Sequence, residues 1–153
     1  MAIMKTVKYI LIILFLLNIN CCVNQTKKDE KQIKKTVIQY FKAVKENDLH
    51  TYNSLIYNSD NYPGITASEL FFLNKNYNKI NSRENLLDNI KIKDTTDIIP
   101  SVKMKYVQYV YKNEKDSNNM KKPLIITLMF YKQIGFNKIY QPVILQNHIG
   151  WDK

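Results

Sequence analysis

The fold depends most on residues 36–57, which read TVIQYFKAVKENDLHTYNSLIY. Apolar side chains in its first half recur every three or four residues, which predicts an amphipathic helix that begins upstream and ends at Asn47. Asp48 follows, and its carboxylate can accept a hydrogen bond from the free backbone N–H groups of a new helix. The stretch therefore predicts two consecutive helices. The inward face of the downstream helix, over 49–57, would consist of Leu49, Tyr52, Leu55 and Ile56.

A third helix is expected after a turn at 58–64. Thr66 and Glu69 have the spacing of a capping box, in which each side chain bonds the backbone N–H of the other residue. This spacing predicts that the helix opens at Thr66. Its inward face would then be formed by Leu70, Phe71, Leu73 and Tyr77.

The composition changes to that of β-strands from residue 98 onward. Residues 98–112 are rich in Val and Tyr and alternate between apolar and polar side chains. The alternation slips near Tyr106 and Val107, which predicts a bulge or a bend.

Two further strands are expected at 124–132 (LIITLMFYK) and 139–147 (IYQPVILQN). Pro142 places the last strand at a sheet edge or a bulge, because proline cannot donate to a strand ladder. Helices that precede long antiparallel strands predict an α+β fold, with the helices packed on one face of a bent sheet.

Residues 36–57 and the closing VILQNHIGWDK at 143–153 resemble the NTF2-like superfamily, a cone-shaped α+β fold that includes SnoaL-like proteins. Residues 36–57 are similar to the opening helix pair of that fold, and residues 143–153 are similar to its last hairpin. The resemblance implies that Trp151 is buried against the first helix. The very short last strand and the long helical region 58–97 depart from the pattern, and a cystatin-like fold is the alternative. The helix face expected to receive Trp151 consists of Val37, Tyr40, Phe41 and Val44.

The first 22 residues carry the features of an export signal. Lys5 and Lys8 precede an unbroken apolar run, YILIILFLL at 9–17. Nine apolar residues suit the core of a signal peptide and are about half of what a membrane-spanning helix needs. The only two cysteines of the chain, Cys21 and Cys22, follow at the boundary with a charged segment.

A signal that ends in cysteine resembles the prolipoprotein signal of bacterial lipoproteins. The resemblance implies that Cys21 or Cys22 receives fatty-acyl chains such as palmitate, and both residues stay open as the attachment site. It further implies a signal peptide at 1–21, a polar tether at 22–31 and one α+β domain at 32–153, anchored by lipid to a membrane of the cell envelope and facing an extracytoplasmic space. An uncleaved anchor, an ordinary secretory signal and a vicinal disulfide are the alternatives.

The chain is basic, with 23 Lys and Arg against 13 Asp and Glu and a formal net charge of +10. Only one of these basic residues is an arginine, Arg83. Surfaces that bind nucleic acid usually use Arg for bidentate contacts to phosphate and guanine. The excess of Lys, Asn and Ile is instead typical of an AT-rich genome, so no nucleic-acid partner is predicted.

Enzymes of the NTF2-like superfamily carry carboxylates and histidines on strands inside the cone, but residues 117–151 of this chain contain no Asp or Glu. The two histidines, His50 and His148, are expected to be an exposed helix residue and an exposed turn residue. Two histidines are a poor metal-ligand set, so neither a metal nor a cofactor is predicted. An acid within hydrogen-bond reach of His50 inside a deep pocket would favour an enzyme.

Strand aromatics offer the remaining candidate site. About half of them would face the helices as core, and the others could line an apolar pocket with hydroxyl groups. The sequence therefore favours a non-catalytic binding or protein-interaction module, whose protein partner would belong to the envelope. A small NTF2-like enzyme, or a carrier of apolar ligands, is the alternative. The candidate pocket residues are Tyr106, Tyr109, Phe130, Tyr131 and Tyr140.

Overall fold

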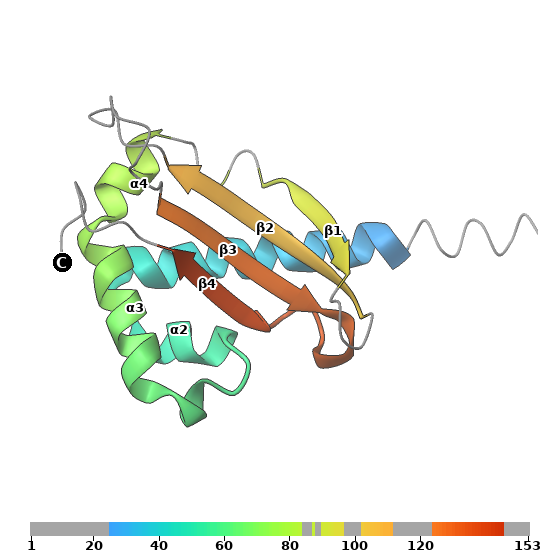
Figure 1. Cartoon of the computed structure of the whole chain (residues 1–153), viewed down its shortest axis with the longest axis horizontal. Helices are drawn as coiled ribbons and strands as arrows, with labels where there is room; N and C mark the ends of the chain where they lie inside the picture. The colour runs from blue at the N-terminus through green and yellow to red at the C-terminus, as the bar shows by residue number, and fades with distance from the viewer. Residues whose placement is uncertain (1–24, 84–86, 88–89, 97–101, 112–123, 146–153) are drawn as a thin grey trace, which may run out of the picture. The chain divides into compact units, whose positions relative to one another are not determined.

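A computed structural model describes residues 25–83, 87, 90–96, 102–111 and 124–145 (Figure 1). Its folded body begins at Ile33. Helices come first and a four-stranded antiparallel sheet follows, which confirms the α+β class.

Several predicted features lie outside the described residues. These are Cys21 and Cys22, of which one is the expected lipid attachment site, the expected turn histidine His148, and the expected closing hairpin with Trp151. Among the residues that are described, no helix is long and apolar enough to cross a membrane.

The first helix covers residues 25–46 and therefore starts inside the segment 22–31 that was expected to be a tether. Asn47 ends it in the left-handed conformation (φ 54°), which asparagine tolerates better than most residues. The buried face of this helix has the predicted 3–4 residue spacing, with Ile33, Val37, Tyr40, Phe41 and Val44 all inside.

Helix α2 (Leu49–Leu55) is capped by Asp48, as predicted. One carboxylate oxygen of Asp48 accepts a hydrogen bond from the backbone N–H of Thr51 at 3.0 Å. Tyr52 and Leu55 are buried, whereas Leu49 is 42% exposed. The prediction for Leu49 is wrong because this seven-residue helix buries only the narrow stripe through Tyr52 and Leu55.

Helix α3 (Pro63–Lys75) begins three residues earlier than predicted. Pro63 occupies its first turn, where the missing N–H of proline costs no hydrogen bond. The predicted capping box is wrong, because Thr66 already lies inside the helix and donates its hydroxyl to the carbonyl oxygen of Pro63 at 3.2 Å. Helix α4 (Tyr77–Arg83) follows directly.

The inward face of α3 also differs from the prediction. Phe72 is buried, while Phe71 is 57% exposed and has the Lys75 ammonium 5.6 Å from its ring centre. Asn74 ties α3 to the first helix, since its amide donates to the backbone oxygen of Val44 at 2.8 Å. In this orientation Glu69 is partly buried rather than free at a helix start.

The sheet is a simple meander in the order β1 (Ile92–Thr96), β2 (Lys103–Tyr111), β3 (Leu124–Tyr131), β4 (Gln141–Leu145). Strands β2, β3 and β4 match the predicted ones, and Pro142 lies on the edge strand β4 as expected. Strand β1 was not predicted, because IKDTT has a single strongly apolar residue.

The predicted bulge near Tyr106 and Val107 is wrong. Strand β2 pairs residue by residue with β1 and β3 through both positions. The apolar pattern changes phase here because β2 has buried side chains on both of its faces. Met104 is buried on one face, and Val107 is buried on the other.

One face of the sheet packs against the helices. Figure 1 shows the first helix, from Ile33 onward, passing behind the strands, with α3 and α4 against one end of the sheet. The ring of Phe41 meets the ring of Tyr109 edge-on, with centroids 5.3 Å apart. The core side of β3 consists of Leu124, Ile126, Leu128 and Phe130, all fully buried.

Candidate functional site: a pocket with a buried carboxyl

A pocket of about 480 Å³ lies between the end of α2, the chain that follows it, α3 and the start of β4. Its wall is partly backbone, because the segments before β4 and after α2 are joined at Ile56 and Ile139. The N–H of Ile139 donates to the oxygen of Leu55 at 2.7 Å, and the N–H of Tyr57 donates to the oxygen of Ile139 at 2.9 Å. The lining residues are Ile56, Tyr57, Asn58, Ser59, Tyr62, Ile65, Thr66, Glu69, Tyr140, Gln141 and Pro142.

The floor between α2 and α3 is shaped by a tight turn. Asn58 adopts the left-handed conformation (φ 54°) and leads into a single 3₁₀ turn, Ser59–Asn61. The Ser59 hydroxyl donates to the carbonyl oxygen of Asn53 at 2.9 Å, which fastens this turn to α2. This hydrogen bond holds the part of the pocket lining that follows α2 against that helix.

Glu69 brings a carboxyl group from α3 into this pocket. Desolvation raises its pKa to about 7, and a side-chain hydrogen bond with Tyr52 partly opposes that rise. The second carboxyl oxygen, Oε2, is buried and has no hydrogen-bond partner among the residues that the structure describes. The Glu69 carboxyl therefore combines a pKa raised to about 7 with a buried oxygen that no donor from the described residues satisfies.

A pair of buried tyrosines stands behind this carboxyl. The hydroxyl oxygens of Tyr40 and Tyr52 are 3.0 Å apart, and both side chains are fully buried. Burial is the main cause that raises the pKa of each phenol, so both hydroxyls stay protonated. Either hydroxyl can be the donor in this contact. The interaction of Tyr52 with Glu69 lowers the pKa of the carboxyl and so favours its ionised form.

Three tyrosine rings, from Tyr57, Tyr62 and Tyr140, surround the pocket and are partly exposed to solvent. The centroids of Tyr57 and Tyr140 are 6.1 Å apart. Tyr140 also meets the edge of Tyr131 at 5.8 Å, so the aromatic row continues from the pocket toward β3.

The charge of the pocket differs from that of the chain. The protein has a formal net charge of +10, yet its eleven described lining residues include no Lys, Arg or His. Glu69 is the single carboxyl among them. The pocket is thus a locally acidic and aromatic site in a basic protein.

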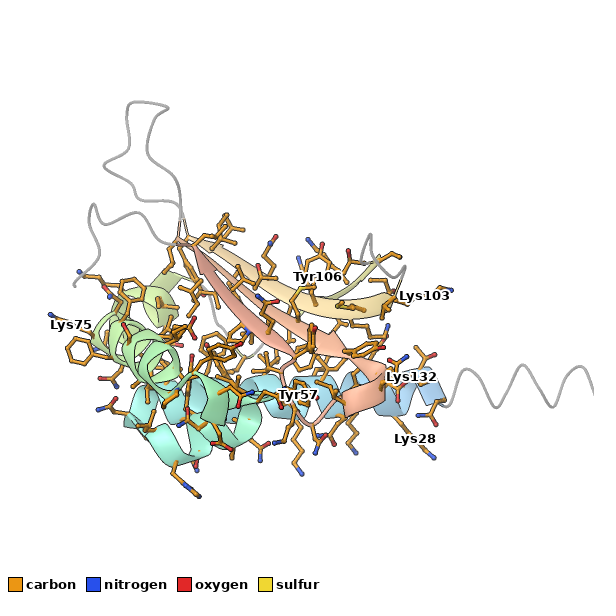
Figure 2. All side chains as sticks on the ribbon, turned by 60° about the horizontal axis from the view of Figure 1, so that its bottom comes forward. Lys28, Tyr57, Lys75, Lys103, Tyr106 and Lys132 are labelled. Atoms are coloured by element: carbon orange, nitrogen blue, oxygen red, sulfur yellow. The ribbon has the colours of Figure 1, made fainter. Side chains whose placement is uncertain are left out.

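The structure does not bring the five predicted pocket residues together. Tyr140 lines the pocket, whereas Tyr109 and Phe130 are buried in the core. Tyr106 and Tyr131 lie on the opposite face of the sheet from Phe130, as their register shows. Figure 2 shows Tyr57 on the helical side of the strands and Tyr106 on the other side.

Asp48 and His50 do not form an acid–base pair in a pocket. The side chain of Asp48 bonds Thr51, which lowers the pKa of this carboxyl, and the side chain of His50 is exposed. The described residues contain no group of three acidic, histidine or cysteine side chains that could hold a metal ion.

Glu69 is the residue that sequence reasoning missed. Its spacing from Thr66 suggests a capping box, although it lies between Thr66 and Leu73 on the buried stripe of α3. A carboxyl within an apolar helical stripe was the available signal. The chain matches no protein-family model, and comparisons with curated proteins and with solved structures likewise produced no match.

Proposed function

We propose that the protein is a ligand-binding module that holds a small molecule in the pocket between α2, α3 and β4. The observation that carries this proposal is that Glu69 lines a pocket of about 480 Å³ while its buried Oε2 has no hydrogen-bond partner among the described residues. Small-molecule sites commonly have volumes of about 300–1,000 Å³, with apolar and aromatic walls and a few polar groups that orient the ligand. The tyrosine rings and the single carboxyl match that composition.

The location and family of this module are proposals from the sequence. Lipid on Cys21 or Cys22 would anchor the domain to a membrane of the cell envelope, with the pocket facing an extracytoplasmic space. The order of helices and strands supports an NTF2-like arrangement. The pocket would then sample solutes outside the cytoplasm or present them to another envelope protein.

A second candidate is catalysis of proton transfer by Glu69. A carboxyl with a pKa of about 7 is well placed for a general base at neutral pH. Enzymes of this kind also need a group that stabilises the negative charge that develops on the substrate; the described lining has no Lys, Arg or His for that role, and no donor is shown within reach of a substrate beside Glu69. Binding without chemistry therefore has the stronger support.

The proposed function is tested with the full chain and a neutral, environment-sensitive fluorescent dye. We expect saturable binding of one dye per protein. Ile65→Trp places a large ring in the pocket from an exposed position on α3 and should weaken binding at least tenfold. Phe71→Trp is the matched control, because Phe71 is an exposed residue of the same helix that does not line the pocket.

Equal dye affinity in both tryptophan variants, or no saturable binding at all, would contradict a ligand site here. Exchange of the α-proton of a small ketone with deuterated solvent, abolished by Glu69→Gln, would instead favour the catalytic candidate.

A further inference from the structure

The hydrogen bonding of the Glu69 carboxyl is incomplete among the described residues. Tyr52 supplies a hydrogen bond to this carboxyl, while Oε2 remains buried without a donor from the described residues. A buried polar atom without a partner is costly, and the cost is larger when the group is ionised. A ligand in the pocket that brings a hydrogen-bond donor to the Glu69 carboxyl lowers that cost, and a positively charged donor lowers it more than a neutral one.

We propose that the pocket selects organic ammonium ions, with the ammonium group against Glu69 and an apolar or aromatic body among the rings of Tyr57, Tyr62 and Tyr140. This inference rests on the proposed function and names its ligand class.

The aromatic lining supports a cation rather than a neutral donor. The faces of tyrosine rings attract ammonium groups within about 6 Å of the ring centre. The rings of Tyr57 and Tyr140 are neighbours, with centroids 6.1 Å apart, and Tyr62 lines the same pocket from the start of α3. The three rings can therefore offer aromatic surface to an ammonium ligand in the same pocket as the carboxyl.

The charge of the lining also disfavours the binding of anions and of divalent metal ions. An anion would meet the Glu69 carboxyl with no Lys or Arg among the described lining residues to compensate. A divalent metal ion takes six or more oxygen ligands and is usually bound in proteins by carboxylates, and the described lining offers one carboxyl without a second acidic side chain beside it. An organic cation needs only one carboxylate, because the rings and the apolar wall solvate its remaining surface.

Ligand binding and proton binding then compete at Glu69. The phenols of Tyr52 on α2 and Tyr40 on the first helix interact with this carboxyl, and the other titratable groups of the described lining are Tyr57, Tyr62 and Tyr140. Burial raises the pKa of both Tyr40 and Tyr52, so neither changes charge between pH 6 and 8. With a pKa of about 7, Glu69 is ionised in about a tenth of molecules at pH 6 and in about nine-tenths at pH 8. The affinity for an ammonium ion should rise close to tenfold across this range, with release of a proton on binding.

The test compares benzylammonium with benzyl alcohol, which has a similar shape and no charge, by calorimetry on the full chain. At pH 8 the wild type should bind benzylammonium at least tenfold more tightly than benzyl alcohol, and this preference should fall close to tenfold at pH 6. Glu69→Gln should abolish both the preference and its pH dependence while benzyl alcohol still binds. Glu46→Gln is the matched control, since it removes the same charge from an exposed position.

Equal affinity for the two compounds at pH 8, with neutral dye still bound, would overturn the ligand class and leave the proposed function standing. A preference that persists in Glu69→Gln would overturn the role of this carboxyl. Loss of binding for the neutral dye as well as both compounds would overturn the pocket itself. The pH dependence in the wild type decides the question even where Glu69→Gln fails to fold.

Discussion

The hydroxyl of Tyr52 on α2 lies 3.0 Å from the hydroxyl of Tyr40 on the first helix, inside the core and behind the carboxyl of Glu69. Two phenols in contact are unusual in an otherwise apolar core, because each needs a partner for its proton. The two hydroxyls are partners for each other, and Tyr52 also interacts with the carboxyl of Glu69. The core therefore contains a polar path that ends at the pocket.

Tyr52→Phe tests this path. It removes one hydroxyl and leaves the Tyr40 hydroxyl and the Glu69 carboxyl each without that hydrogen bond. We expect a loss of about 1–3 kcal/mol in the free energy of unfolding, measured in urea at pH 8. Because the bond with Tyr52 lowers the pKa of Glu69, the variant should also titrate at higher pH. Tyr62→Phe, an exposed phenol, is the control and should change stability by less than about 0.5 kcal/mol.

The pH dependence of stability has an unusual sign at Glu69. Its pKa is raised from 4.5 to about 7 on folding, so the folded protein binds more protons than the unfolded chain between these values. Below about pH 4.5 this group makes its full contribution to the free energy of unfolding. That contribution is lost as the pH rises through about 7. Allowing for the part of the carboxyl that water still reaches, the loss is about 2 kcal/mol.

Glu69→Gln should abolish this dependence. We expect urea unfolding from pH 4.5 to pH 8 to show that the free energy of unfolding of the variant rises by about 2 kcal/mol relative to that of the wild type. A constant difference between the two proteins would mean that Glu69 titrates normally in the folded state.

The two faces of the sheet should respond differently to truncation. Phe130→Ala empties a fully buried core position and should cost about 3–5 kcal/mol in the free energy of unfolding. Tyr106→Ala changes a half-buried residue on the opposite face and should cost clearly less. Similar losses, measured by thermal or urea unfolding, would contradict the register of β2 and β3.

Lipid attachment is expected at one of the two cysteines that end the apolar run. Metabolic labelling of the full chain with a fatty-acid probe should mark the wild type, and Cys21→Ser combined with Cys22→Ser should abolish the label. The two single variants identify the modified residue. An unlabelled wild type in a bacterial host that processes lipoproteins would count against membrane anchoring.

Local patterns in the sequence predict the helices and strands well. The 3–4 residue spacing of the first helix and the Asp48 cap depend on neighbours along the chain, and both occur as expected. Pro142 likewise marks an edge strand for a local chemical reason, its missing N–H. Strand β1 escapes detection because its pairing with β2, rather than its own composition, stabilises it.

The pocket depends on packing that no local pattern encodes. Tyr40, Tyr52 and Glu69 come from three different helices, and only the way these helices meet brings their polar atoms together. The start of α3 is likewise not determined by local spacing alone. Thr66 and Glu69 satisfy the capping-box spacing, yet Pro63 begins the helix and turns Glu69 toward the interior.

The most direct measurement is the titration of Glu69 itself, followed by NMR of protein labelled with ¹³C in its glutamate carboxyls. The resonance is assigned by its loss in Glu69→Gln. The account predicts a pKa of about 7 for Glu69 in the free protein, which moves well below 7 when the pocket is saturated with benzylammonium and stays in place with benzyl alcohol. A free-protein value near the ordinary glutamate value of about 4.3, unchanged by benzylammonium, would contradict it.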